Sequence, residues 1–221
     1  MPIDPSRTVA ELVLERPSRA RVFEELGLDY CCRGGTPLTD ACAARGIAVE
    51  QASAALEAAA DAPTDERDWT TVPLAELCDH IEAEHHARLR EELPRLDELL
   101  AKVVRSHRTE RHSLVELHDT FTTLRSDLEE HLAAEEELLF PLVRAGGPYE
   151  PDQLKELEHD HAWAGTALER MRELADGYEL ERALCNTHRA ALDGLHELEL
   201  DLHQHIHEEN NVLFPRVLAA A

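Results

Sequence analysis

The sequence has few basic residues for its length. Its 221 residues include 46 aspartates and glutamates but only 22 lysines and arginines, which gives a formal net charge of −24 at pH 7. Nucleic acids and anionic membrane surfaces bind proteins that present a positive surface. The charge balance therefore argues against nucleic acid and against membrane as partners.

Aromatic residues and long hydrophobic runs are also scarce. Phe, Trp and Tyr make up only 4% of the chain, and alanine, leucine, glutamate and arginine are abundant. This composition favours an all-α fold over a β-sandwich or barrel. No apolar run approaches the ~20 residues that a membrane-spanning helix needs. The N-terminal MPIDPSRTVAEL lacks the hydrophobic core of a signal peptide, so we expect a cytoplasmic protein.

Cysteine and histidine differ sharply in number. The five cysteines are too few for a disulfide framework in a chain of this length. The 14 histidines, in contrast, are many for an acidic helical protein, and they require a chemical explanation.

The helical pattern predicts two domains. Residues 1–62 contain short helical segments, the first opened by a capping box of Thr8 and Glu11, and include the loop DYCCRGG. Residues 63–72 are polar and contain proline, which is typical of a linker. Residues 73–221 contain four long amphipathic segments, which predict a four-helix bundle.

The second of these long segments has the most regular apolar face. Its core positions recur at alternating steps of three and four residues, as in a seam that faces a bundle core. The predicted seam consists of Leu114, Leu117, Phe121, Leu124, Leu128, His131, Glu135, Leu138 and Leu142.

The second and fourth long segments form an internal repeat. A shift of 74 residues, without a gap, places His131 on His205 and Glu135 on Glu209, so that H-x-x-x-E-x-x-x-x-F-P occurs twice. Residues four apart lie one turn apart on the same helical face. Each His/Glu pair therefore occupies core positions, where a carboxylate costs several kcal/mol unless it is paired or bound to metal. The alternative is that these polar residues lie at helix ends that open to solvent. That alternative explains a single His/Glu pair better than two pairs at equivalent positions of the repeat.

The other two long segments supply further candidate ligands. His161 lies on the apolar face of the third, and either His85 or His86 can face inward from the first. Imidazole and carboxylate groups on facing helices are typical of a site for two iron or manganese ions. Zinc is less favoured, because structural zinc sites use thiolates and no cysteine falls on the repeated motif.

The doubled motif, its LLFP and VLFP endings and the DYCCRGG loop resemble the repair-of-iron-centres family of iron–sulfur cluster repair proteins. The resemblance covers nearly the whole chain. It implies a hemerythrin-like four-helix bundle preceded by a small helical domain that carries adjacent cysteines. It also implies two non-haem iron ions bridged by carboxylates and by an oxo or hydroxo group.

The resemblance further implies which histidines bind the metal. The spacing to the next proline selects His86, although the helical angles favour His85. The segment HAWAG selects His161 over His159, in agreement with the periodicity.

A further histidine of the family matches His107, with His112 as the alternative. Five imidazoles and two bridging carboxylates supply nine bonds to two ions that offer about twelve positions. An oxygen bridge takes two more and leaves one position for a small ligand such as O2 or nitric oxide. The implied ligands are His86, His107, His131, Glu135, His161, His205 and Glu209.

The adjacent Cys31 and Cys32 are candidate catalytic residues. Neighbouring cysteines form a strained disulfide, so a stable bond between them is not expected. A following helix N-terminus and Arg33 predict lowered thiol pKa values, which suits redox chemistry or transient capture of metal or nitric oxide. The alternative is that both are small apolar residues in a turn.

The leading hypothesis is therefore a di-iron stress-response protein. We expect it to restore clusters in iron–sulfur client proteins after oxidative or nitrosative damage, by iron delivery, by nitric oxide reduction at the di-iron site, or by both. The alternative is a hemerythrin-like module that binds or senses O2 or nitric oxide without turnover. Turnover of nitric oxide separates the two.

Overall fold

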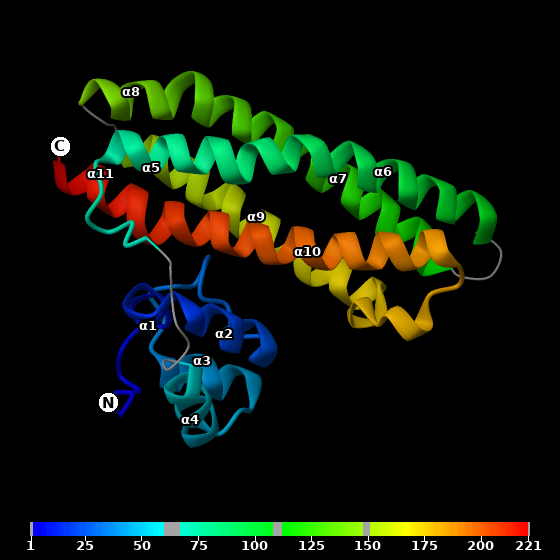
Figure 1. The fold of residues 1–221 in the computed structure, drawn as a ribbon, viewed down its shortest axis with the longest axis horizontal. Helices are drawn as coiled ribbons and strands as arrows, with labels where there is room; N and C mark the ends of the chain where they lie inside the picture. Colours follow the sequence, from blue (N-terminus) through cyan, green and yellow to red (C-terminus); the bar gives the residue numbers. More distant parts are fainter. Residues whose placement is uncertain (1, 60–66, 108–111, 148–150, 221) are drawn as a thin grey trace. The chain divides into compact units, whose positions relative to one another are not determined.

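The computed structural model of the chain describes residues 2–59, 67–107, 112–147 and 151–220. Within these residues the regular secondary structure is helical, apart from one isolated bridge between Thr8 and Pro37 (Figure 1). The predicted all-α fold is confirmed. Residues 63–66 of the expected linker lie outside the described residues.

The chain divides into two compact units. The first contains Met1–Pro73 and His203–Ala220, and the second contains Leu74–Leu202. The boundary falls inside the last long helix, whose final residues belong to the same unit as the N-terminal helices.

The N-terminal part of the first unit is built from short helices. The predicted capping box is confirmed, because the Glu11 N–H donates to Thr8 Oγ1 at 3.2 Å and the Thr8 N–H donates to the Glu11 carboxylate at 3.1 Å. The second helix ends at Gly27, which has a left-handed φ of 63° that favours glycine. The helices are α1 (Val9–Glu15), α2 (Ala20–Leu26), α3 (Leu38–Arg45) and α4 (Val49–Ala59), with a 3₁₀ turn at Pro17–Arg19.

The short helices of the first unit share one apolar core. Its fully buried side chains include Leu12, Phe23, Leu38 and Leu56, one from each helix. The C-terminal part of this unit consists of the end of α10 (Asn186–Glu208), the segment η6 (Glu209–Leu213) and α11 (Phe214–Ala220).

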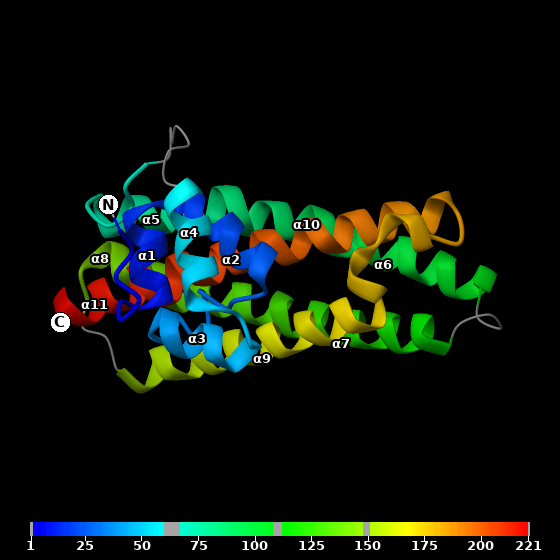
Figure 2. The ribbon, with the colours of Figure 1, turned by 90° about the horizontal axis from the view of Figure 1, so that it is seen from below.

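The second unit contains the long helices. Helix α7 packs against both α6 and α9, and α6, α7, α9 and α10 run along a common direction, as expected for a bundle (Figures 1 and 2). Pro94 lies inside α6, which continues past it. The elements are α5 (Leu74–Ile81), η2 (Glu82–His86), α6 (Ala87–His107), α7 (His112–Ala134), η3 (Glu135–Leu139), α8 (Phe140–Ala145), α9 (Pro151–Leu174), the 3₁₀ turns η4 (Asp176–Tyr178) and η5 (Leu180–Arg182), and α10 (Asn186–Glu208).

Three five-residue π-helical segments, η2, η3 and η6, interrupt the long helices. The residue after each segment donates its N–H to the carbonyl five residues earlier, as Phe140 does to Glu135. Pro141 and Pro215 follow two of these segments. Proline has no N–H and clashes with the carbonyl four residues before it, so it favours the wider turn.

The π-helical turn in η3 changes the register of the predicted core seam. Leu138 and Leu142 were expected on the core face but are exposed, with Leu138 at 64%. Leu139, at 2% exposure, takes the buried position instead. The turn holds one extra residue, which rotates the helix beyond it by about 100°, so the expectation for both leucines was wrong.

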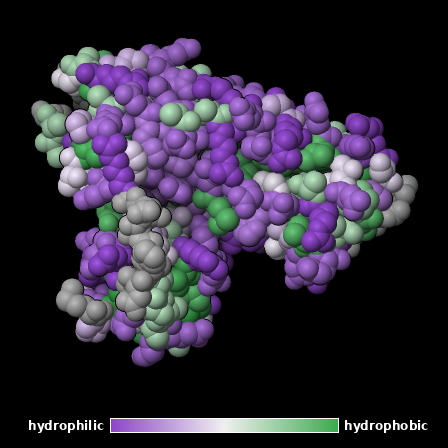
Figure 3. Space-filling view, in the orientation of Figure 1, coloured by the Kyte–Doolittle hydropathy of each residue, from purple (hydrophilic) through white to green (hydrophobic). Residues whose placement is uncertain are grey.

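The surface agrees with the charge of the sequence. The face seen in Figure 3 is mostly hydrophilic, with small and scattered hydrophobic patches. Among the described residues, no helix combines the length and the apolar character needed to cross a membrane.

Candidate metal centre

The two repeated His/Glu pairs lie at the π-helical turns. Glu135 is the first residue of η3 and Glu209 is the first residue of η6, and both side chains are fully buried. A carboxylate in such a place requires a positive charge or strong donors nearby. π-Helical turns occur frequently at functional sites, and here they coincide with the residues that the repeat singles out.

Glu135 faces two different imidazoles with its two oxygens. Its Oε1 lies 3.3 Å from His131 Nε2, and its Oε2 lies 3.4 Å from His86 Nε2. All three side chains are buried. A carboxylate with one oxygen toward each of two ligand sets has the geometry of a bridge between two cations.

His131 and His161 point their ring nitrogens at each other. The two Nε2 atoms are 2.9 Å apart, and the ring centroids are 4.7 Å apart. Neighbouring nitrogen ligands at metal–nitrogen distances of about 2.1 Å lie about 3 Å apart on an octahedral ion. The observed separation therefore fits two ligands of one cation.

The second repeated pair has the same internal arrangement. His205 Nε2 lies 3.1 Å from Glu209 Oε1, and both residues are buried. Like His131 and Glu135, the two side chains lie one turn apart on the same helical face.

Six of the seven predicted ligands fall into two groups able to hold a metal ion. Within each group, one donor atom per residue lies within 4.8 Å of the others. Both glutamates belong to both groups, whereas each histidine belongs to one. The first group is His86, Glu135, His205 and Glu209, and the second is His131, Glu135, His161 and Glu209.

The adjacent His85 and His86, at the end of η2, contact different partners. His86 faces Glu135, whereas His85 Nδ1 lies 3.2 Å from Asp201 Oδ1 and its ring is next to that of His80. His86, and not His85, is therefore the histidine grouped with the two glutamates.

Glu136 holds His86 from the side opposite Glu135. Its Oε1 lies 2.8 Å from His86 Nδ1, and Arg90 donates to its Oε2 at 2.7 Å. Burial raises the pKa of Glu136, but the hydrogen bonds from Arg90 and His86 outweigh it and bring the pKa below its usual value. An ionised carboxylate on Nδ1 orients the ring and leaves Nε2, which faces Glu135, as the atom able to bind a metal. Glu136 cannot be identified from the sequence, because three consecutive glutamates give no signal that separates them.

Two further contacts shape the surroundings of these histidines. His131 Nδ1 lies 3.4 Å from Asp160 Oδ2, which gives His131 a carboxylate on its outer nitrogen. The ring of Phe140 stacks on His86 with centroids 5.5 Å apart. His159, the residue before Asp160, is exposed.

His107 is the one predicted ligand that lies elsewhere. It ends α6, 21 residues after His86, and at 1.5 Å per residue the two are about 30 Å apart. Its side chain instead hydrogen bonds to the thiol of Cys185. The alternative His112 is exposed at the start of α7, 19 residues before His131. The family pattern placed a histidine after the first long helix but could not show which end of the bundle it reaches.

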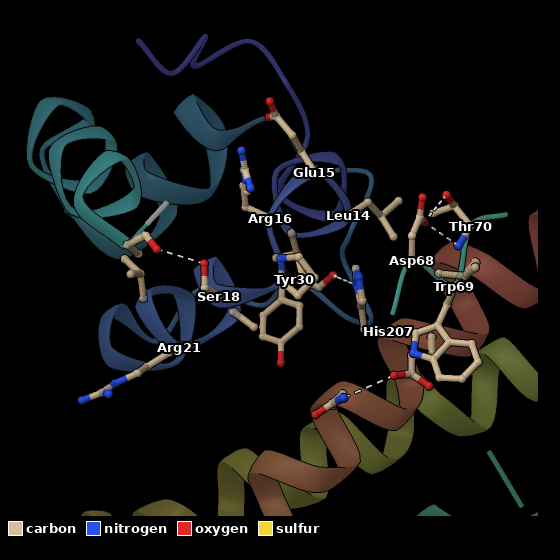
Figure 4. A pocket seen from close by; sticks show the side chains of 18 of the residues that line it. Leu14, Glu15, Arg16, Ser18, Arg21, Tyr30, Asp68, Trp69, Thr70 and His207 are labelled. Atoms are coloured by element: carbon tan, nitrogen blue, oxygen red, sulfur yellow. Dashed lines mark hydrogen bonds between the residues drawn. The ribbon is translucent and has the colours of Figure 1, made fainter. Parts of the chain in front are cut away.

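The cysteine loop lies in the first unit and is held by side chains from η6 and the end of α10. Asn211 Nδ2 donates to the Cys31 carbonyl at 3.1 Å, and His207 Nδ1 lies 3.3 Å from the Tyr30 carbonyl (Figure 4). Tyr30 and His207 also line a cavity of about 760 Å³ in this unit. Gly34 is required here, because a Cβ atom would lie 2.3 Å from Asn211 Oδ1.

The cysteines themselves are reduced and differ in exposure. Cys31 is buried and Cys32 is partly exposed, with their Sγ atoms 3.6 Å apart. The expectation of a lowered pKa is wrong for Cys31. The hydrogen bond with Cys32, burial and the negative charge of Asp29 raise its pKa.

A helical bundle with buried His/Glu pairs at π-helical turns defines the class of hemerythrin-like cation-binding proteins. The family described as the hemerythrin HHE cation-binding domain matches residues 79–217 of the chain. A second family, ScdA_N, described as a domain of unknown function (DUF542), matches residues 5–60. The chain belongs to the family of iron–sulfur cluster repair proteins, and both domains are matched within it.

Curated relatives match almost the full length of the chain. It is 36% identical over 213 residues to the iron–sulfur cluster repair protein YtfE of Pectobacterium atrosepticum. It is 37% identical over 212 residues to the proteins of the same name from Citrobacter koseri and Escherichia coli O157:H7. Each alignment covers 96% of this chain and 96% of the relative.

Proposed function

We propose that this protein repairs damaged iron–sulfur clusters and does so with two non-haem iron ions. The observation that carries the proposal is the sharing of Glu135 and Glu209 by both groups of donors. Two buried carboxylates common to two pairs of imidazoles suit two cations held close together. The names of the relatives supply the reaction class.

The donor set leaves room for a small ligand. Four imidazole nitrogens and two oxygens from each of two carboxylates give eight bonds, while two six-coordinate ions offer about twelve positions. An oxo or hydroxo bridge would fill two of the remaining four. The count is one bond lower than the sequence implied, because His107 does not contribute. The iron ions, when bound, would supply electron transfer and a binding position for nitric oxide or O2.

The protein residues around the ions have separate tasks. His86 is oriented by Glu136, and the stacked ring of Phe140 covers one of its faces. The two buried glutamates would neutralise the positive charge of cations held away from water. Cys31 and Cys32 would release or trap what the centre handles, either iron or a nitrosyl group.

We assign these tasks to two cytoplasmic domains. Residues 1–62 form the cysteine-bearing domain, residues 63–72 the linker and residues 73–221 the di-iron bundle. The partners are iron–sulfur client proteins and a small gas ligand, and the large negative charge makes nucleic acid an unfavourable partner.

Iron analysis and a repair assay on one preparation test this function. We expect about two irons per chain and recovery of a client enzyme whose iron–sulfur cluster has been damaged by nitric oxide. A single zinc per chain after reconstitution with iron would contradict the di-iron site. Iron-loaded protein that restores no cluster and binds nitric oxide reversibly, without forming nitrous oxide, would instead indicate a gas-binding module.

A further inference from the structure

The loop that carries the two cysteines holds a second kind of donor cluster. One oxygen of Asp29 and the sulfurs of Cys31 and Cys32 all lie within 4.8 Å of one another. The two sulfurs are 3.6 Å apart, and Cys31 Sγ lies 3.4 Å from Asp29 Oδ1. All three residues belong to the first unit.

The spacing of the sulfurs matches that of two thiolates on one metal ion. Metal–sulfur bonds of about 2.3 Å at tetrahedral angles place the sulfurs about 3.8 Å apart. A disulfide would require about 2.05 Å, and adjacent cysteines reach that geometry only with strain. The arrangement is thus closer to a chelating pair than to a pair about to oxidise.

The backbone fixes this cluster before any ligand arrives. Asp29 Oδ1 accepts the N–H groups of Cys31, Cys32 and Arg33 at 3.1, 2.9 and 3.3 Å. The Cys31 carbonyl is held in turn by Asn211. A preformed set of donors loses little conformational freedom when a cation binds.

The charges within the cluster favour a cation. A carboxylate and two thiols lie together, and the hydrogen bond with Cys32, burial and repulsion from neighbouring negative charge raise the pKa of Cys31. A divalent cation that replaces the thiol protons would convert this repulsion into attraction. As each sulfur–metal bond forms, the thiol releases its proton to solvent, and no electron is transferred.

We propose that Asp29, Cys31 and Cys32 form a mononuclear site for one thiophilic divalent cation, with Fe²⁺ as its cargo. Two sulfurs and one oxygen leave a fourth tetrahedral position open, as suits an exchange site better than a closed structural one. Cys32 is partly exposed and gives access from solvent. Only the identity of the cargo depends on the proposed repair function.

Cobalt titration of the iron-loaded full-length protein tests the site. Co²⁺ bound by thiolates gives an intense sulfur-to-metal charge-transfer band, which nitrogen and oxygen ligands of the di-iron centre do not give. We expect one equivalent of Co²⁺ to produce this band. A wild-type protein without it would overturn the proposal.

Two variants and a control identify the donors. Cys31→Ser combined with Cys32→Ser should abolish the band, whereas Cys185→Ser, which removes a thiol outside the cluster, should leave it unchanged. Asp29→Asn keeps an oxygen for the three N–H groups but loses the charge, and we expect about tenfold weaker binding. A band that survives the double substitution, or equal affinity in the Asp29 variant, would contradict the assigned donors.

The repair assay on the same preparations separates this proposal from the function above. Intact repair without cobalt binding would overturn the metal site and leave the repair function standing. Cobalt binding without any repair would overturn the repair function and leave the metal site standing.

Discussion

The side-chain amide of Asn211 donates a hydrogen bond to the backbone carbonyl of Cys31, with 3.1 Å between the nitrogen and the oxygen. Asn211 lies two residues after Glu209 in the same π-helical segment. The segment that supplies Glu209, a candidate metal-binding carboxylate, therefore also fixes the cysteine loop. A movement of the cysteine loop should therefore also shift Glu209, which lies two residues before Asn211 in the chain.

Gly34→Ala tests the close approach that this hydrogen bond needs. The new Cβ would lie 2.3 Å from Asn211 Oδ1 and 2.8 Å from Ala10 Cβ, so we expect a loss of about 1–3 kcal/mol in the free energy of unfolding. Gly35→Ala is the matched control, since its Cβ would meet nothing within 4 Å. Urea unfolding measures both. Equal stability of the two variants would show that the loop does not need Gly34.

Replacing either shared carboxylate should damage the metal centre. In Glu135→Ala or Glu209→Ala each cation loses a ligand, and we expect the loss of about half or more of the bound iron. His159→Ala, which changes an exposed side chain, should retain its iron. Elemental analysis of the three purified variants gives the comparison, and equal iron in all three would argue against the shared glutamates.

Glu136→Gln should weaken metal binding without removing a ligand. The substitution takes the charge from the carboxylate on His86 Nδ1, and loss of such a partner lowers metal affinity by about 10–100-fold. Glu137→Gln changes the exposed neighbour and should have no effect. Iron affinity can be measured by competition with a chelator, and a wild-type value for Glu136→Gln would show that its charge is not needed.

His107→Ala should leave the iron content unchanged and slow the alkylation of Cys185. The N–H of His188 donates to the Cys185 thiol, and together with the side chain of His107 it lowers the thiol pKa. The thiolate reacts, so at neutral pH Cys185 should alkylate faster than Cys42, whose pKa burial raises. Mass spectrometry after a short iodoacetamide pulse measures each site. Loss of iron in this variant would return His107 to the ligand set.

The π-helical turn buries Leu139 and exposes Leu138, so replacing these adjacent leucines should change the free energy of unfolding by different amounts. Leu139→Ala should lower the free energy of unfolding by about 2–5 kcal/mol, because it empties a buried site. Leu138→Ala changes an exposed side chain and should stay within about 0.5 kcal/mol of the wild type. A larger loss at Leu138 would mean that the helix continues without the wide turn.

These leucines also show how far the sequence could predict the fold. The helical class and the capping box of Thr8 follow from local patterns, and the structure confirms both. The periodicity of α7 located Glu135 on the core face but assumed an unbroken α-helix beyond it. The one extra residue in the π-helical turn changes which side chains beyond it are buried. The wider turn is favoured by Pro141, which has no N–H to donate, and hydrophobic patterning does not record this effect.

The candidate metal site likewise contains residues that the sequence predicts and a choice that only the structure makes. The repeat located His131, Glu135, His205 and Glu209, because a buried polar motif at the same depth in two helices is a strong local signal. The choice between His85 and His86 depends on which carboxylates neighbouring helices present, and that is tertiary information.

The repeat has a further meaning at the two positions after each shared glutamate. In one copy these are Glu136 and Glu137, and in the other they are Asn210 and Asn211. In the first copy Glu136 hydrogen bonds to His86 and orients its ring. In the second copy Asn210 and Asn211 donate hydrogen bonds to the backbone of the cysteine loop. The two copies of the repeat thus differ in what these positions contact, a candidate metal ligand in one copy and the cysteine loop in the other.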